Sequence, residues 1–213
     1  MQAWFCETLS GPEGLVWKEV PTPTPGPGEV RIAIRAASLN FPDTLTVQGK
    51  YQFKPPLPFV PGSEYAGIVE AAGDGVTQVQ VGDAVAAMGS TGGFATHGIA
   101  PAKSVLKLPP GFALEDAAAF ALTYGTTHHA LVDRAALKAG ETVLVLGAAG
   151  GVGSSAIQVA KAVGAKVIAA ASSDEKCAFC RTLGADATLN YATQNVRDAL
   201  KELTGGKGPD VVY

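Results

Sequence analysis

Apolar and polar residues follow two different patterns along the chain. Up to about residue 113, short β-type apolar runs alternate with clusters rich in glycine and proline. This pattern predicts strands at 30–36, 67–72, 83–87 and 104–108. Closely spaced strands of this kind indicate a small, irregular β-barrel or sandwich.

The second pattern begins with an alanine-rich stretch, 114–132, which predicts helix with a break near Gly125. Strand-like and helix-like segments then alternate: strands at 142–146, 166–171 and 187–189, helices at 152–163, 174–183 and 195–204, and a final strand opening at 210–213. Repeated βα units predict a parallel, doubly wound α/β domain with right-handed crossovers. All but one of the 14 prolines precede residue 111, so we place the domains at 1–113 and 114–213. Because 210–213 opens a buried strand, we expect the sequence to be a piece of a longer protein.

A glycine-dense turn between the predicted strand 142–146 and the helix after it carries the strongest chemical signal. Small residues there leave the N–H groups of a helix N-terminus open to a ligand, which is the physical requirement for holding a pyrophosphate. Gly150 and Gly151 allow close approach of the backbone, and Gly153 lets the helix lie close to its strand. The strand–turn–helix context favours dinucleotide binding over an ordinary glycine-rich βα turn.

Composition and charge exclude several classes of protein. An apolar content of 47%, with 16% charged residues, is typical of a globular protein. A net charge of −3 without a basic block argues against nucleic acid as the main partner. The sequence has no apolar run of membrane-spanning length and no signal-peptide pattern, so we expect a cytoplasmic protein without membrane contact. Cys177 and Cys180 supply only two ligands, so free thiols are favoured over a metal or redox site.

With these elements in place, the chain resembles the zinc-free NADPH:quinone oxidoreductases, the zeta-crystallin-like branch of the medium-chain dehydrogenase/reductase superfamily. The segments that carry the resemblance are 27–30, 38–43, 61–69, 81–85, 148–153 and 190–191. It implies a GroES-like N-terminal β-barrel domain, a partial Rossmann domain, and a homodimer for the full-length protein.

The same resemblance bears on metal. Zinc-dependent relatives carry cysteine and histidine where this chain has Asn40 and Ser63, and neither is a plausible zinc ligand. The adjacent His128 and His129 would point about 100° apart on a helix. We therefore expect no metal and no zinc alcohol dehydrogenase chemistry.

The predicted strand 166–171 is followed by Ser172 and Ser173, where NAD-specific sites carry Asp or Glu. Serine hydroxyls can donate to a 2′-phosphate, and Lys176 is placed to pair with it as a point charge. In the resembling family, a lysine here and a tyrosine matching Tyr191 contact that phosphate. Asp174 is the counter-argument, since it would either N-cap the helix or bind ribose. We expect NADPH, with its pyrophosphate on Gly150–Gly153 and with Ala149, Gly150, Gly151 and Val152 among the cofactor-binding residues.

For the nicotinamide end, the resemblance implies contacts from Asn40 and from Thr126 or Thr127. Asn40 is alternatively a turn residue before Phe41. Tyr51 matches a tyrosine of the quinone pocket and would orient a carbonyl or stack on a flat ring, or else serve as loop packing.

These residues lead to NADPH-dependent hydride transfer to quinones or other activated enones, with a small-molecule substrate and Tyr51 and Asn40 as the catalytic candidates. Reduction of enoyl thioesters by the same family is an open alternative. Two further alternatives are a non-catalytic nucleotide-binding module and a fragment that has no activity of its own.

Overall fold

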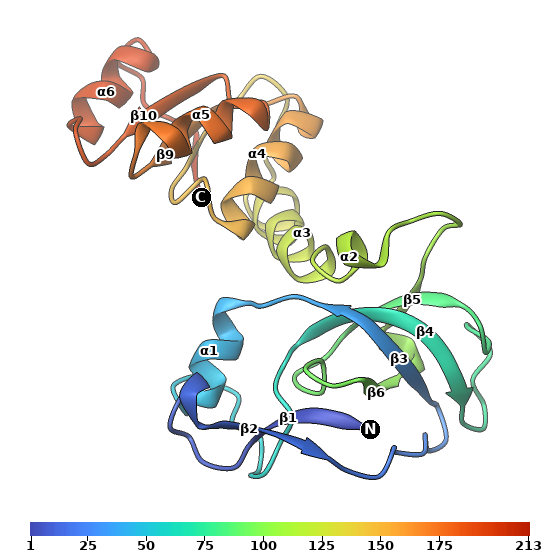
Figure 1. Ribbon diagram of the computed structural model, residues 1–213. Helices are drawn as coiled ribbons and strands as arrows, with labels where there is room; N and C mark the ends of the chain where they lie inside the picture. The colour runs from blue at the N-terminus through green and yellow to red at the C-terminus, as the bar shows by residue number, and fades with distance from the viewer. The chain divides into compact units, whose positions relative to one another are not determined.

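The computed structural model describes residues 1–213 (Figure 1), which divide into two compact units, Met1–Leu122 and Thr123–Tyr213. The division falls inside helix α3 (Ala121–His128). The boundary between residues 113 and 114 that the proline distribution suggests stays a prediction. Each unit is described by itself.

Unit 1 is built on a curled antiparallel sheet with the strand order β6-β3-β4-β5-β7. Its strands are β3 (Glu29–Ala37), β4 (Glu64–Ala72), β5 (Ala84–Met88), β6 (His97–Pro101) and β7 (Val105–Lys107). A separate hairpin-like pair joins β1 (Gln2–Cys6) to β2 (Leu15–Glu19), and two short helices, α1 (Phe41–Val47) and α2 (Leu114–Ala117), complete the unit. Register shifts between β3 and β4 mark irregularities that bend the sheet. The predicted small, irregular β domain is confirmed.

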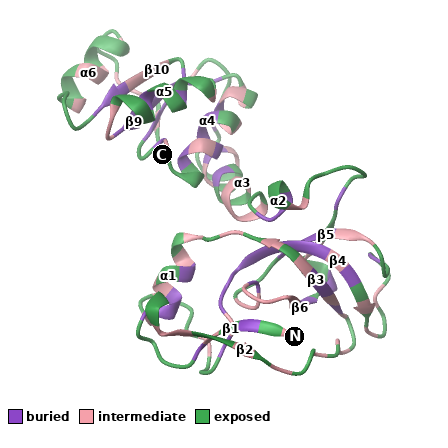
Figure 2. Ribbon diagram, viewed as in Figure 1, coloured by how far each residue is buried: buried purple, intermediate pink, exposed green.

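Alternation along β3 and β4 explains the core of unit 1. Val30, Ile32 and Val69 are fully buried and pack with Tyr65 and Val85. Burial raises the pKa of the Tyr65 phenol to about 12, because the phenolate is poorly solvated inside the sheet. The buried strands appear purple in Figure 2.

Unit 2 contains a parallel sheet with the order β10-β9-β8-β11. Its strands are β8 (Thr142–Val145), β9 (Lys166–Ala171), β10 (Ala187–Asn190) and β11 (Val211–Val212). Its helices are α4 (Gly151–Val163), α5 (Asp174–Thr182) and α6 (Val196–Leu203), after a π-helical turn at His129–Arg134. Every element predicted after residue 140 is present within one or two residues of its expected bounds.

The two faces of this sheet are separated by the period-two alternation of a strand. Val143 and Val145 pack into the cluster that includes Ile157 of α4 and Cys180 of α5. Leu144, between them, points to the opposite face and joins the cluster covered by α6. Helices therefore cover both faces, as the doubly wound prediction requires.

Two expectations for the helical connection and the first unit were wrong. Gly125 lies inside α3, and the interruption comes earlier, between α2 and α3. A glycine in a helix interior costs only about 1 kcal/mol, which the fold accommodates. The strand pattern also missed β1, β2 and β6 and the helix α1, whose apolar runs are short or interrupted.

Candidate functional site

The turn between β8 and α4 is shaped by glycines at defined positions. Gly147 has φ +58°, a left-handed conformation that glycine adopts without strain. Gly150 is the N-cap of α4, and its N–H donates to the carbonyl of Gly147 at 3.0 Å. The turn therefore closes on itself before the helix begins.

Gly153 is required by close packing. A Cβ at this position would lie 2.5 Å from the Gly147 carbonyl oxygen and 2.7 Å from the Ala148 Cα. Both contacts are with backbone atoms of the turn that follows β8, so a side chain would push the helix away from that turn. Gly153 is therefore needed for the close approach of α4 to the turn that ends its strand.

The first turn of α4 leaves unpaired donors. The N–H groups of Gly151, Val152 and Gly153 have no hydrogen-bond acceptor within the chain. Together with the positive end of the helix dipole, they form a cradle that suits a diphosphate group. The residues present therefore fit the pyrophosphate of a dinucleotide.

A cavity of about 150 Å³ adjoins this turn. It is lined by residues from four segments: Gly147, Ala149, Gly150, Ala171, Ser172, Lys176 and Tyr191. Five of the residues expected to bind the cofactor are thereby brought to one place: Ala149, Gly150, Ser172, Lys176 and Tyr191. The exposed Lys176 ammonium donates to Ser172 Oγ at 3.1 Å, so cation and hydroxyl face the same space.

The hydrogen-bonding roles of Ser173 and Asp174 differ from the expectation. Ser173 is the N-cap of α5, and its Oγ accepts the N–H of Lys176 at 3.2 Å. The suggestion that Asp174 caps the helix was therefore wrong. The Asp174 carboxylate instead accepts a hydrogen bond from the Asn190 side-chain amide at 2.9 Å.

The two threonines expected near the nicotinamide occupy different environments. Thr127 is fully buried, and its hydroxyl lies 2.7 Å from Ser155 Oγ and 3.0 Å from the Tyr213 hydroxyl. This cluster ties α3 to α4 and to the end of β11. Thr126 is exposed, so of the two alternatives it is the one with a side chain free to reach a ligand.

In unit 1, Asn40 begins helix α1 and belongs to a hydrogen-bonded cluster. Its backbone N–H donates to Asp43 Oδ2, and its side-chain amide donates to Ser38 Oγ, both at 2.9 Å. Ser38 in turn donates to the fully buried Glu64 at 2.8 Å, and Ser63 donates to Asp43 at 2.9 Å. Sequence reasoning missed Asp43, although Asn-x-x-Asp at a helix start is a recognisable capping pattern.

Tyr51 lines a cavity of about 130 Å³ in unit 1. Its walls include Asp43, Phe53, Ser63 and Leu122. The cavity places the half-buried Tyr51 phenol and the Phe53 ring beside four polar side chains, those of Asp43, Thr46, Ser63 and Ser90. Phe53 was missed because its apolar neighbours form no periodic pattern.

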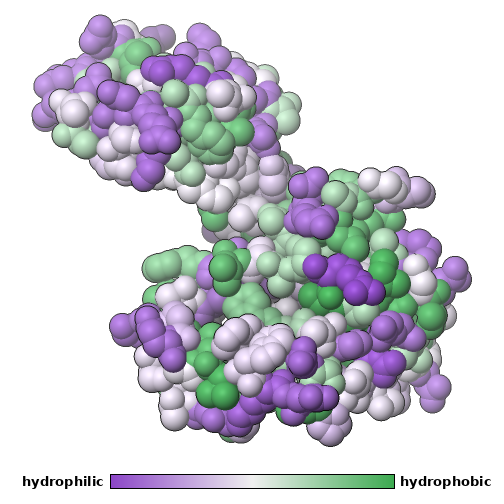
Figure 3. Space-filling model, viewed as in Figure 1, coloured by the Kyte–Doolittle hydropathy of each residue, from purple (hydrophilic) through white to green (hydrophobic).

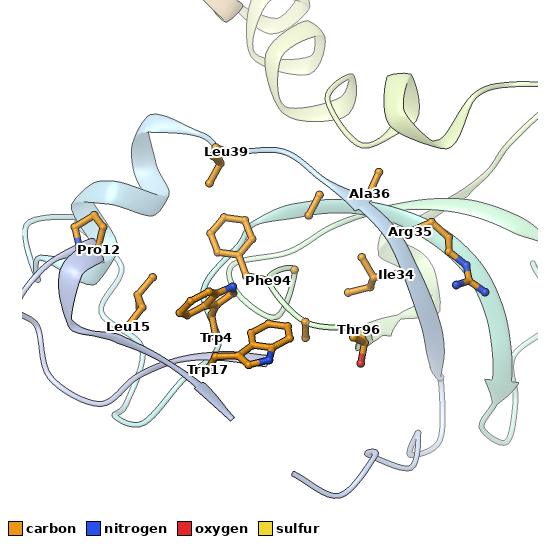
Figure 4. A pocket seen from close by; sticks show the side chains of 13 residues that line it. Trp4, Pro12, Leu15, Trp17, Ile34, Arg35, Ala36, Leu39, Phe94 and Thr96 are labelled. Carbon is orange, nitrogen blue, oxygen red and sulfur yellow. The ribbon is translucent and has the colours of Figure 1, made fainter. Parts of the chain in front are cut away.

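A second, larger cavity of about 550 Å³ in unit 1 is lined in part by aromatic side chains (Figure 4). Trp4 of β1 and Trp17 of β2 are register partners, and their ring centroids lie 5.2 Å apart. Phe94 and Leu39 also line it. The face in Figure 3 shows apolar surface interspersed with polar groups.

Several smaller expectations concern the remaining titratable groups. The three cysteines are free and buried, and burial raises the pKa of the Cys180 thiol. His128 and His129 are exposed beside Asp133. The structure holds no group of three or more His, Cys, Asp or Glu arranged for a metal ion.

The structure contains no helix with the length and apolar character needed to cross a membrane.

Comparison with known proteins adds to this geometry. Residues 26–110 match the alcohol dehydrogenase GroES-like domain family, and residues 151–213 match the zinc-binding dehydrogenase family. The chain is 42% identical over 211 residues to quinone oxidoreductase-like protein 2 of Rattus norvegicus, covering 99% of this chain and 60% of that protein. It thus spans about three fifths of the length of the curated relatives it matches.

Solved structures agree. A probable oxidoreductase from Mycobacterium abscessus superposes with a TM-score of 0.93 at 43% identity, covering 100% of this chain and 68% of that one. The Escherichia coli quinone oxidoreductase complexed with NADPH gives a TM-score of 0.90 at 33% identity, covering 100% of this chain and 65% of that one.

Proposed function

This chain belongs to the medium-chain dehydrogenase/reductase superfamily, among its quinone oxidoreductase-like members, and on that premise we propose that it carries the NADPH site and part of the substrate site of a zinc-independent reductase. Its substrates are quinones or other activated enones. The observation that supports the proposal most directly is the open row of N–H groups at the start of α4 beside a cavity containing Lys176.

The preference for NADPH over NADH is supported by the charges around that cavity. Lys176 and Ser172 present a cation and a hydroxyl, and none of the residues lining the cavity is acidic. A 2′-phosphate there gains charge-assisted hydrogen bonds, whereas the ribose hydroxyls of NADH lack the carboxylate acceptor they require.

Zinc independence is supported by the chemistry of the residues at the positions in question. Asn40 and Ser63 offer an amide and a hydroxyl, which are poor zinc ligands. Both side chains are engaged as donors, Asn40 to Ser38 and Ser63 to Asp43. We expect turnover to be unaffected by a strong chelator.

The dihydronicotinamide, when bound, supplies the hydride. The residues of the chain bind and orient: the turn at Gly150–Gly153 holds the diphosphate, Lys176 holds the 2′-phosphate, and Asn40 offers an amide without introducing a charge. We propose that Tyr51, which lines the small cavity of unit 1, donates a hydrogen bond to a substrate carbonyl oxygen, where negative charge develops during reduction.

The test has two parts. Calorimetry should show that the chain binds NADPH, and that it binds NADH with lower affinity. Lys176→Ala should remove most of this difference in affinity between the two nucleotides. Absorbance at 340 nm should then fall when NADPH is mixed with a simple quinone, and Tyr51→Phe should lower kcat/KM for the quinone while leaving the Kd for NADPH unchanged. Binding without turnover of quinones, enones or enoyl thioesters would contradict the reductase assignment. An absence of binding to either nucleotide would contradict the whole proposal.

A further inference from the structure

Two acidic residues lie next to Lys176 in the sequence, yet neither lines its cavity. Asp174 and Glu175 occupy the first turn of α5, and both are exposed. Asp174 lines a different cavity, of about 400 Å³, together with Cys177, Arg181 and Asn190. The Asp174 carboxylate is therefore turned toward the edge strand β10.

Asn190 holds Asp174 in that direction, and its own orientation is determined by the backbone around it. Asn190 Oδ1 accepts the N–H of Ala192 at 3.0 Å. Its backbone N–H donates to Gln194 Oε1 at 2.8 Å, and its carbonyl accepts the Gln194 N–H at 2.9 Å. The residue is 7% exposed. Only an amide oxygen can accept from Ala192, so the NH₂ group must face Asp174, to which it donates at 2.9 Å.

We infer that Asn190 is a specificity-determining positioning residue, which holds the Asp174 carboxylate away from the Lys176 cavity and thereby preserves the preference for a 2′-phosphorylated nucleotide. The inference deepens the proposed function and rests on it. A carboxylate released from Asn190 can swing toward the cavity, where it repels a 2′-phosphate and accepts hydrogen bonds from the free hydroxyls of an unphosphorylated ribose. Asn190 acts through Asp174 and needs no contact with the nucleotide.

The probes are 2′,5′-ADP and 5′-AMP, which report on this end of the site without any turnover. Calorimetry at pH 7 and low salt gives the ratio of the two Kd values for the wild-type chain, Asn190→Ala, Asp174→Ala and the double variant. We expect Asn190→Ala to reduce the preference for 2′,5′-ADP about five- to tenfold, from a like charge brought near the phosphate in a high-dielectric surface site. Asp174→Ala alone should change the preference little, and the double variant should return to the wild-type ratio.

The matched control is Asn195→Ala. Asn195 caps α6 by accepting the Asp198 N–H at 3.2 Å, so this variant also removes an asparagine hydrogen bond from the same segment while leaving Asp174 untouched. Its preference should equal that of the wild type. Should Asn190→Ala fail to fold, Asn190→Asp keeps the acceptor for Ala192, but it replaces the donor to Asp174 by a second, negatively charged carboxylate oxygen. It should show the same reduced preference, and its combination with Asp174→Asn, which restores an amide–carboxylate pair, should recover it.

The outcomes separate the two levels of the argument. A wild-type chain that binds neither probe overturns the proposed nucleotide site and this inference with it. A wild-type chain that prefers 2′,5′-ADP, together with an Asn190 variant of unchanged preference, overturns only the inference. A double variant that stays as impaired as Asn190→Ala also overturns it, since the effect would then not pass through Asp174.

Discussion

Replacing Gly153 by alanine tests the close approach of α4 to the turn before it. The added Cβ would lie 2.5 Å from the Gly147 carbonyl oxygen, so one of the two must move by about 0.9 Å to reach the 3.4 Å at which ordinary contact begins. The Ala148 Cα and carbonyl carbon, at 2.7 and 2.8 Å, block the alternative directions. Overpacking of this kind costs about 1–3 kcal/mol, and alanine's better helix propensity returns about 1 kcal/mol at most.

We therefore expect Gly153→Ala to lower the free energy of unfolding by about 1–2 kcal/mol, measured from urea unfolding followed by circular dichroism. Gly151→Ala is the matched control for stability, because its Cβ would meet only the Thr123 Cγ2 at 3.4 Å. The same shift misaligns the N–H groups of the first helical turn, so the Kd for NADPH should rise at least about tenfold in Gly153→Ala. Unchanged stability and unchanged Kd in Gly153→Ala would refute the packing argument.

Three further predictions concern single side chains. Because the pKa of Tyr65 is about 12 when folded and near its ordinary value of 10.0 when unfolded, stability should fall as pH rises through that window, and Tyr65→Phe should flatten the alkaline unfolding curve. Partial burial opposes the ionisation of Asp186, but hydrogen bonds from Lys161 and a backbone N–H outweigh it and lower its pKa. Its stabilisation is therefore complete above pH 3.8 and lost as pH falls through the folded-state pKa, so the gap in urea midpoint between wild type and Asp186→Asn should close in acid. Thr127→Val, which removes a buried hydroxyl between two partners, should cost about 1–3 kcal/mol of unfolding free energy, against less than about 0.5 kcal/mol for the exposed Thr126→Val; equal losses would contradict the buried cluster.

The second half of the fold could be predicted because its signals are local. Apolar runs of strand length, helical spacing and glycine turns repeat in order, and α4, β9 and α5 begin and end within one residue of where these signals place them. In the first half the strands are shorter and the sheet is bent. The strand β1 follows no clear alternation, and it is held by pairing with β2 and by a bridge from Ala3 to Ala95, a residue far away in sequence. Pairing between residues far apart in the sequence cannot be recognised from a short stretch of the sequence.

The candidate cofactor site was partly predictable for the same reason. Gly150 and Lys176 stand at positions that strand and helix ends determine, so their meeting around one cavity follows from the order of the elements. The directions of individual polar side chains did not follow. Ser173 rather than Asp174 caps α5, and the Asp174 carboxylate instead accepts a hydrogen bond from Asn190 on another strand.

The sequence by itself determined the doubly wound sheet, the glycine turn and the placement of a cation after the second strand of unit 2. These depend on backbone sterics and on burial patterns that repeat every two or 3.6 residues. Only the tertiary structure decided which polar groups stay free to bind a ligand and which form hydrogen bonds within the chain. Thr127 meets Tyr213 from 86 positions away, and Asp174 meets Asn190 from 16. A hydrogen bond depends on where two groups lie in space, and spacing along the chain does not encode that.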